Sequence, residues 1–112
     1  MRRLAFAIAL AAGAPAAAQE GVNDYPTEAR ADYVFACMAT NGQTRYMLAR
    51  CACSIDVIAT ILPYDDYVAA ETVLRMRLAP GERSAMFRGT ATTTAIVADL
   101  RRAQAEAEIV CF

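Results

Sequence analysis

Four cysteines constrain this chain more than any other feature of its sequence: Cys37, Cys51, Cys53 and Cys111. A single alanine separates Cys51 from Cys53, whereas Cys37 and Cys111 lie far from this pair on either side. Residues two apart on a helix point to opposite sides, so Cys51 and Cys53 cannot bond to each other without distortion. The pattern therefore predicts a central helix tied by sulfur on both sides, once to Cys37 and once to Cys111.

The first eighteen residues, MRRLAFAIALAAGAPAAA, have the layout of a secretory signal peptide. Arg2 and Arg3 supply the positive start, residues 4–12 form a short apolar run, and residues 16–18 supply small side chains at the cleavage site. The apolar run is shorter than the roughly 20 residues that a membrane-spanning helix needs. We therefore expect general secretion into the periplasm, cleavage after Ala18, and no membrane span in the mature protein.

The mature chain is expected to be small and mildly acidic. Cleavage after Ala18 leaves 94 residues without lysine, and the loss of Arg2 and Arg3 moves the net charge from −1 to −3. Nucleic acids and anionic membranes attract clustered positive charge, so this composition argues against both as partners. The length allows one domain, which we place over residues 27–112, and exported chains this short commonly depend on cross-links.

Helical periodicity begins after a polar segment over residues 19–26, which we expect to be a flexible lead-in. Thr27 is predicted as the N-cap of the first helix, and Gly42 as its end, because glycine tolerates the left-handed backbone that ends many helices. Glycine and threonine are poor helix formers, so the last segment is expected to break near residues 89–92. The predicted helical segments are residues 27–41, 44–62, 65–78 and 82–109.

Apolar residues recur along these segments at intervals of three and four, which is typical of helices that bury one face. The second segment carries a further apolar row, so it is expected to be covered by neighbours on both sides. The fold class that follows is all-α, a small bundle of four to five helices stapled by two disulfides. The expected core-facing residues are Tyr33, Val34, Cys37 and Met38, then Cys51, Ile55, Ile58 and Leu62 (with Met47 or Leu48), then Tyr67, Ala70, Leu74 and Leu78, and finally Met86, Thr90, Thr93, Val97, Leu100, Gln104, Ala107 and Cys111.

An even number of cysteines in a short exported chain favours structural disulfides. In a hairpin that turns near Gly42, Cys37 lies level with about residue 47, so Cys51 is closer to it than Cys53 by about 3 Å of helix rise. We therefore prefer Cys37–Cys51 with Cys53–Cys111. The alternative pairing is Cys37–Cys53 with Cys51–Cys111.

Other roles for the cysteines fit the spacing less well. Zinc sites use knuckles with two to four residues between paired ligands, and this chain has one residue between Cys51 and Cys53. A copper(I) site would use soft sulfur, with Met38 and Met47 near the cysteines in sequence. A thioredoxin-like redox role needs a Cys-x-x-Cys motif, which the chain lacks. We therefore predict no resident metal and no other cofactor.

The chain has no histidine, which excludes serine–histidine and cysteine–histidine catalysis and histidine-ligated metals. It also lacks a glycine-rich phosphate loop and a calcium-loop pattern. Asp56 is the unusual acid, because it lies between two apolar rows, and we expect it to pair with Arg45 or Arg50 or to cap a buried polar group. We predict no enzymatic activity. The remaining acid/base candidates are Asp65, Asp66, Glu71, Tyr64 and Tyr67.

The stretch CACSIDVIATILPYDDYVAAETV resembles small exported bacterial proteins of unassigned function that carry a Cys-x-Cys between two outer cysteines. The resemblance covers about residues 33–75. More loosely, the chain is similar to the HdeA-like periplasmic helical proteins, which protect other proteins in acid. Those proteins have one disulfide and lysine-flanked ends, and this chain has neither feature. The resemblance implies a helical periplasmic protein and assigns no functional residue.

The expected function is that of a non-catalytic periplasmic accessory protein that works by contact with another periplasmic protein. A bundle this small has little room for an enclosed ligand pocket, so an exposed apolar face is the expected working surface. One alternative is a small copper-type carrier that uses cysteine and methionine sulfur. Another is an acid-responsive chaperone. The candidates for the working face are Tyr25, Tyr33, Tyr46, Tyr64 and Tyr67.

Overall fold

The computed structural model describes residues 23–78, 80–81 and 89–112. Within these ranges the chain forms four helices and no strand, which confirms the all-α prediction. The predicted signal peptide, residues 19–22 of the predicted lead-in, and residues 82–88, where the last helix was expected to begin, lie outside the described residues. The helices are α1 (Thr27–Asn41), α2 (Arg45–Ile61), α3 (Tyr64–Leu78) and α4 (Ala91–Cys111).

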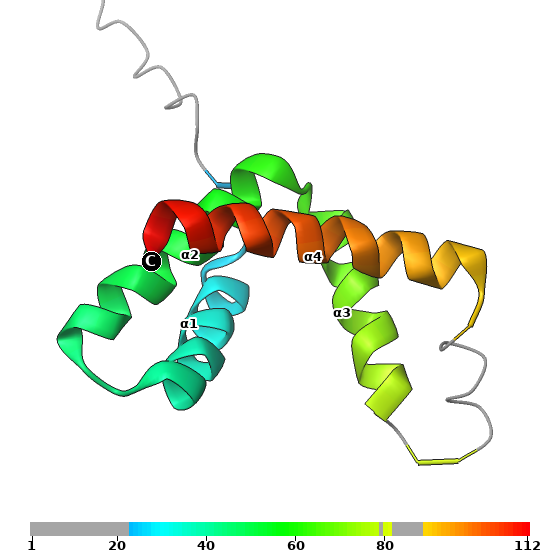
Figure 1. Cartoon of the computed structure of the whole chain (residues 1–112), viewed down its shortest axis with the longest axis horizontal. Coiled ribbons are helices and arrows are strands. Elements are labelled where there is room, and N and C mark those ends of the chain that lie inside the picture. The colour runs from blue at the N-terminus through cyan, green and yellow to red at the C-terminus, as the bar shows by residue number, and fades with distance from the viewer. Residues whose placement is uncertain (1–22, 79, 82–88) are drawn as a thin grey trace, which may run out of the picture.

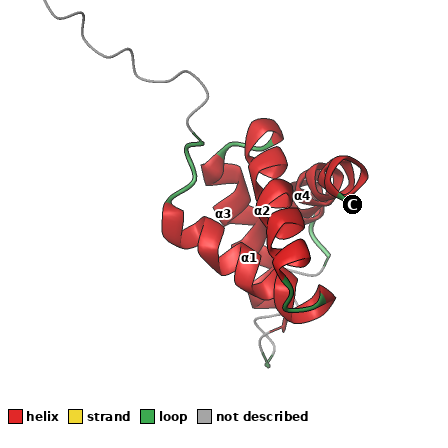
Figure 2. Cartoon of the chain, turned by 90° about the vertical axis from the view of Figure 1, so that its left-hand side faces the viewer, coloured by secondary structure: helices red, strands yellow, loops and turns green. Residues whose placement is uncertain are grey.

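Helix α2 has the central position that its two apolar rows predict. It packs against α1 on one side and α4 on the other, and α4 also packs against α3 (Figures 1 and 2). Between α2 and α3 the helix direction changes by 113°. Helix α4 lies across both α2 and α3. In the view of Figure 1, α1 and α3 lie below α4 and point away from each other. No single helix in the described ranges is long and apolar enough to cross a membrane, although α2 and α3 pass that test as a bent pair.

Local sequence signals define most of the helix ends. The Thr44 hydroxyl accepts a hydrogen bond from the Met47 amide at 3.1 Å, and the Thr90 hydroxyl accepts one from the Thr93 amide at 3.2 Å. Both threonines are therefore N-caps. The α4 start at Ala91 lies within the predicted break over residues 89–92.

Helix α1 begins differently from the prediction, although it ends where expected. Thr27 is its first helical residue, and Pro26 occupies the N-cap position. The Pro26 side chain has no acceptor for a capping hydrogen bond. The Pro26 carbonyl nevertheless accepts the first helical bond from the Arg30 amide at 3.1 Å. At the other end Gly42 has φ of 118°, in the left-handed region that favours glycine.

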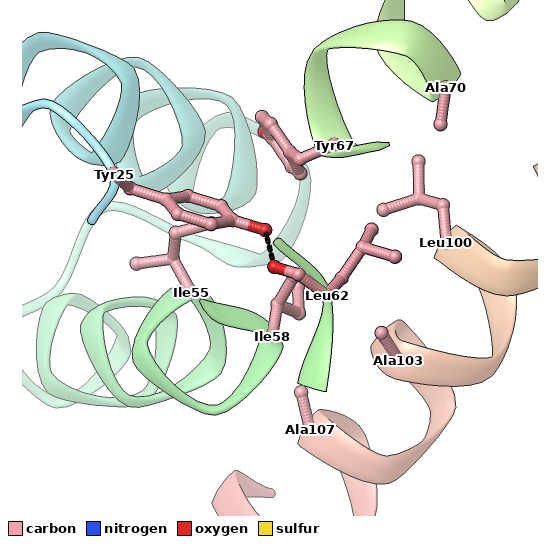
Figure 3. Close-up of a cluster of buried hydrophobic side chains, with 9 residues drawn as sticks. All are labelled: Tyr25, Ile55, Ile58, Leu62, Tyr67, Ala70, Leu100, Ala103 and Ala107. Atoms are coloured by element: carbon pink, nitrogen blue, oxygen red, sulfur yellow. Dashed lines mark hydrogen bonds between the residues drawn. The ribbon is translucent and has the colours of Figure 1, made fainter. Parts of the chain in front are cut away.

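The core lies where α2, α3 and α4 meet (Figure 3). Ile55 and Ile58 of α2 are buried against Leu100, Ala103 and Ala107 of α4, and all five are at most 1% exposed. The two alanines have the small side chains that allow α4 to approach α2 closely. The predicted core-facing stripe of α2 is therefore confirmed.

The predicted stripe of α3 is correct only in its first half. Tyr67 and Ala70 are buried, but Leu78 is 87% exposed, and Val73 is buried instead. The reason is that α3 packs on α4 near its own start and then runs away from the bundle (Figure 1). The last turn of α3 therefore extends past the core.

Two disulfides hold α2 from opposite sides, with the preferred connectivity. Cys37 of α1 is bonded to Cys51, and Cys111 at the end of α4 is bonded to Cys53. The paired Cα atoms lie 5.9 Å and 5.8 Å apart, within the usual range for disulfides. All four cysteines are therefore oxidised.

The segment before α1 differs from the prediction of a flexible lead-in over its described part, residues 23–26. Tyr25 is only 2% exposed, and its hydroxyl donates a hydrogen bond of 2.7 Å to the Leu62 carbonyl (Figure 3). The Tyr25 ring lies 5.1 Å from the Tyr64 ring and 5.0 Å from the Tyr67 ring, between centroids. Asp24 accepts a hydrogen bond of 3.3 Å from the first amide of α3, at Tyr64. This segment therefore fastens the chain to the corner between α2 and α3.

The two disulfides are expected to contribute unequally to stability. Replacing Cys53 and Cys111 by alanine removes a cross-link over a sequence separation of 58, and should lower the free energy of unfolding by about 4 kcal/mol. The matched Cys37→Ala, Cys51→Ala variant removes a separation of 14 and should cost about 3 kcal/mol. Urea unfolding measures both values. A larger loss from the shorter loop would contradict the chain-entropy explanation.

Burial raises the pKa of the Tyr25 and Tyr67 phenols above the ordinary value of 10, with nearby carboxylates adding to the effect. The folded state therefore keeps these protons at a pH where the unfolded state releases them. Their contribution to stability is complete below pH 10 and decreases as the pH rises above it, by up to about 1.4 kcal/mol per pH unit for each tyrosine.

Tyr25→Phe should reduce this alkaline loss of stability by removing one of the two phenols. It should also cost about 1–3 kcal/mol at neutral pH, because the buried Leu62 carbonyl loses its donor. Urea unfolding from pH 8 to pH 11 checks both effects, with the exposed Tyr46→Phe as the control. An alkaline slope that is the same in Tyr25→Phe as in the wild type would disprove the assignment.

Candidate functional site

An apolar groove lies between α1 and α2 and has a volume of about 440 Å³. This volume is within the range of about 300–1,000 Å³ that is typical of ligand-binding hollows. Most of the lining side chains are apolar, and they come from three successive turns of α1 and from residues 48–56 of α2. The lining residues are Thr27, Arg30, Ala31, Val34, Phe35, Met38, Leu48, Ala52, Ile55 and Asp56.

The groove exposes large apolar side chains that the rest of the fold leaves uncovered. Phe35 is 75% exposed and Leu48 is 40% exposed, so the two opposite walls carry unburied apolar surface. Ile55 forms part of the lining from the core side, where it is buried. Contiguous exposed apolar surface on a small protein is typical of an interaction site.

Charge is confined to one end of the groove. Arg30 of α1 and Asp56 of α2 approach to 3.9 Å there, and Asp56 also accepts a hydrogen bond of 3.2 Å from the Asn23 side chain. The Nε atom of Arg30 is buried and has no hydrogen-bond partner among the described residues. The Arg30 side chain as a whole is 37% exposed, so its outer guanidinium nitrogens can donate hydrogen bonds at this end of the groove.

The expected partners of Asp56 were wrong, because Arg45 and Arg50 are not its partners in the structure. Asp56 lies toward the end of α2, level with the start of α1, and so it meets Arg30 instead. Arg50 lies six residues before Asp56 on α2 and donates to the Cys111 carbonyl at the end of α4. Its guanidinium carbon is also 4.2 Å from the centre of the Tyr46 ring. A cation at this end of α4 is favoured by the helix dipole.

The five tyrosines do not form one working face. Tyr25 and Tyr67 are buried, Tyr33 and Tyr64 are half-buried, and Tyr46 is exposed at the far side of α2 near the end of α4. Three of them form the aromatic cluster that fastens residue 25 to α3. The Tyr33 hydroxyl lies 2.9 Å from the buried Ser54 hydroxyl and satisfies it. Packing therefore explains four of the five.

The acid/base candidates are dispersed over the fold. Asp65 and Asp66 lie exposed in the first turn of α3, where the helix dipole favours carboxylates. Glu71 lines a polar hollow of about 480 Å³ between α1, α3 and α4, together with Tyr67 and Arg101. Asp56 lies apart from them, at the α1–α2 groove. Within the described ranges, no three side chains of the aspartate, glutamate, cysteine or histidine type gather closely enough to hold a metal ion.

Sequence reasoning missed Phe35 and Arg30 as groove residues. The available signal was a second row on the first helix, in which Ala31, Phe35 and Met38 follow one another at intervals of four and three. The prediction assigned Met38 to the core-facing row of Tyr33, Val34 and Cys37, whereas Met38 lines the groove. A row of one alanine and two large apolar residues gives no direct indication that it lines a groove rather than a core.

Comparisons with protein-family models, with curated proteins and with solved structures find no match for this chain.

If the groove is a surface for a partner, its exposed side chains should not stabilise the fold. Phe35→Ala is expected to change the free energy of unfolding by no more than about 0.5 kcal/mol, because the side chain is already in solvent. Ile55→Ala, from the buried side of the same groove, should cost about 2–5 kcal/mol. Urea unfolding of the two variants compares them. If Phe35→Ala lowered the free energy of unfolding by more than about 1 kcal/mol, Phe35 would be packed against the fold rather than exposed for a partner.

Proposed function

We propose that this chain is a non-catalytic accessory protein of the periplasm that binds another exported protein through the α1–α2 groove. The observation that carries the proposal is the exposure of Phe35 and Leu48 on facing walls of an apolar hollow. Burying such side chains in a complex gives about 25 cal/mol for each Å² of apolar surface removed from water. An interaction site of this composition binds apolar side chains of a partner.

The copper-carrier alternative loses its main ligands in the oxidised protein. Copper(I) binds thiolates and thioethers, and all four cysteine sulfurs are engaged in disulfides. Met38 lies on the groove wall and Met47 is half-buried near the start of α2. Two thioethers without a thiolate would form only a weak copper(I) site, so the protein-binding proposal is preferred.

The acid-chaperone alternative needs an electrostatic contact whose loss in acid would open the fold. The ion pairs within the described residues all include exposed side chains, so protonating their carboxylates removes little stability. The disulfides also persist in acid. No observation on the described part of the chain therefore favours this alternative over the groove.

Site-specific cross-linking in the periplasm tests the proposal. A photoreactive amino acid at position 48 should give a defined product with one other protein, and the additional change Phe35→Asp should remove that product. A photoreactive amino acid at position 109, which is 83% exposed on α4, is the matched control and should not give it. A product that forms equally from both positions, or that survives Phe35→Asp, would place the contact elsewhere and overturn the proposal.

A further inference from the structure

The walls of the groove restrict the conformation of a bound segment. Both walls are α-helices, whose backbone amides and carbonyls are already paired within each helix. An extended segment in this groove would find no backbone partner in either wall and would depend on water, whereas a helical segment satisfies its backbone groups internally. The groove therefore selects a helix over a strand.

The length of the groove agrees with this choice. Its α1 wall extends from Thr27 to Met38, which corresponds to about 16 Å of helix rise, or three turns. A docked helix presents apolar residues at i, i+3 or i+4, and i+7 over about 10 Å. The apolar side chains between Ala31 and Met38 on one wall, and Leu48 and Ala52 on the other, cover this distance.

Arg30 supplies the polar part of the recognition. Its nearest acid, Asp56, is 3.9 Å away and already accepts a hydrogen bond from Asn23, while the Arg30 Nε atom is buried without a partner among the described residues. The Arg30 side chain is 37% exposed, so its outer guanidinium nitrogens, unlike the buried Nε atom, can be reached by a ligand that supplies an acceptor. A carboxylate is the strongest acceptor for a guanidinium, because the two planar groups can form paired hydrogen bonds.

We infer that the α1–α2 groove binds the apolar face of an amphipathic helix from another protein, and that a carboxylate beside that face bonds to Arg30. The inference rests on the proposed function and adds the class of the partner segment. The apolar side chains supply most of the affinity, and Arg30 fixes the direction and register of the helix.

A displayed library of amphipathic helical peptides of about 18 residues, randomised along and beside the apolar stripe, tests the inference on the oxidised full chain. The chain has no tryptophan, so a tryptophan fixed in the peptides reports binding without background fluorescence. The selected peptides should carry Asp or Glu at one fixed position beside the stripe. Arg30→Gln should weaken their binding at least about tenfold, and Ile109→Ala, on the exposed face of α4, less than about twofold.

A double-mutant cycle identifies the bonded pair. Changing the selected acid of the peptide to its amide should weaken binding to the wild type by the same factor, and should have little further effect on Arg30→Gln. Arg30→Lys should keep the charge but lose part of the affinity, because an ammonium cannot form the paired geometry. Far-ultraviolet circular dichroism of Arg30→Gln checks that its fold is intact.

Several results would overturn the inference. These are peptides selected without an acid, binding that is insensitive to Arg30→Gln, enrichment of extended peptides, or no groove-dependent binder. Sedimentation that shows a dimer of this chain, dissociated by Phe35→Asp, would assign the groove to a second copy instead. A cross-linked partner at position 48 whose binding ignores Arg30 would leave the proposed function standing without the inference. If the peptides bind but no cross-linked product forms in the periplasm, the preference of the groove for a helix would stand and the proposed function would not.

Discussion

The two disulfides hold α2 from opposite sides and link it to α1 and to the end of α4. Cys51 and Cys53 point in different directions because they are two residues apart on one helix, so one bond reaches α1 and the other reaches the end of α4. The bond to Cys37 has a particular consequence. Most helices are held in place by a buried apolar face, but α1 has no buried residue. The covalent link from Cys37 to Cys51 therefore helps to hold α1 against α2.

This arrangement explains how the groove can exist in so small a protein. A helix that is fastened by sulfur at Cys37 and by the buried Tyr25 just before its start does not need to bury Ala31, Phe35 and Met38. These side chains are free to line the groove instead. Apolar surface that would otherwise stabilise the fold is thereby left exposed, available to the partner that we propose, and the same covalent link keeps the two groove walls together.

The sequence predicted the helices, the central place of α2 and the disulfide pairing, because helical periodicity and the Cys-x-Cys geometry are local properties. It did not predict the packing of residues 23–26, since that depends on Leu62 and Tyr64, about 40 residues later in the chain. The exposure of Leu78 was missed for a similar reason: a stripe shows which face of a helix is apolar, but not where its neighbour ends. The groove was missed because Phe35 and Arg30 acquire their roles only when α1 meets α2.

Hydrogen exchange of α1 after removal of its disulfide shows whether the sulfur link or apolar packing holds this helix in place. In the Cys37→Ala, Cys51→Ala variant, the amides of α1 should lose most of their protection, while those of α2, α3 and α4 around Ile58 and Leu100 keep theirs. That result would show that sulfur, rather than burial, holds the groove wall in place. Protection of α1 that is unchanged in the variant, or a loss spread evenly over all four helices, would contradict the account.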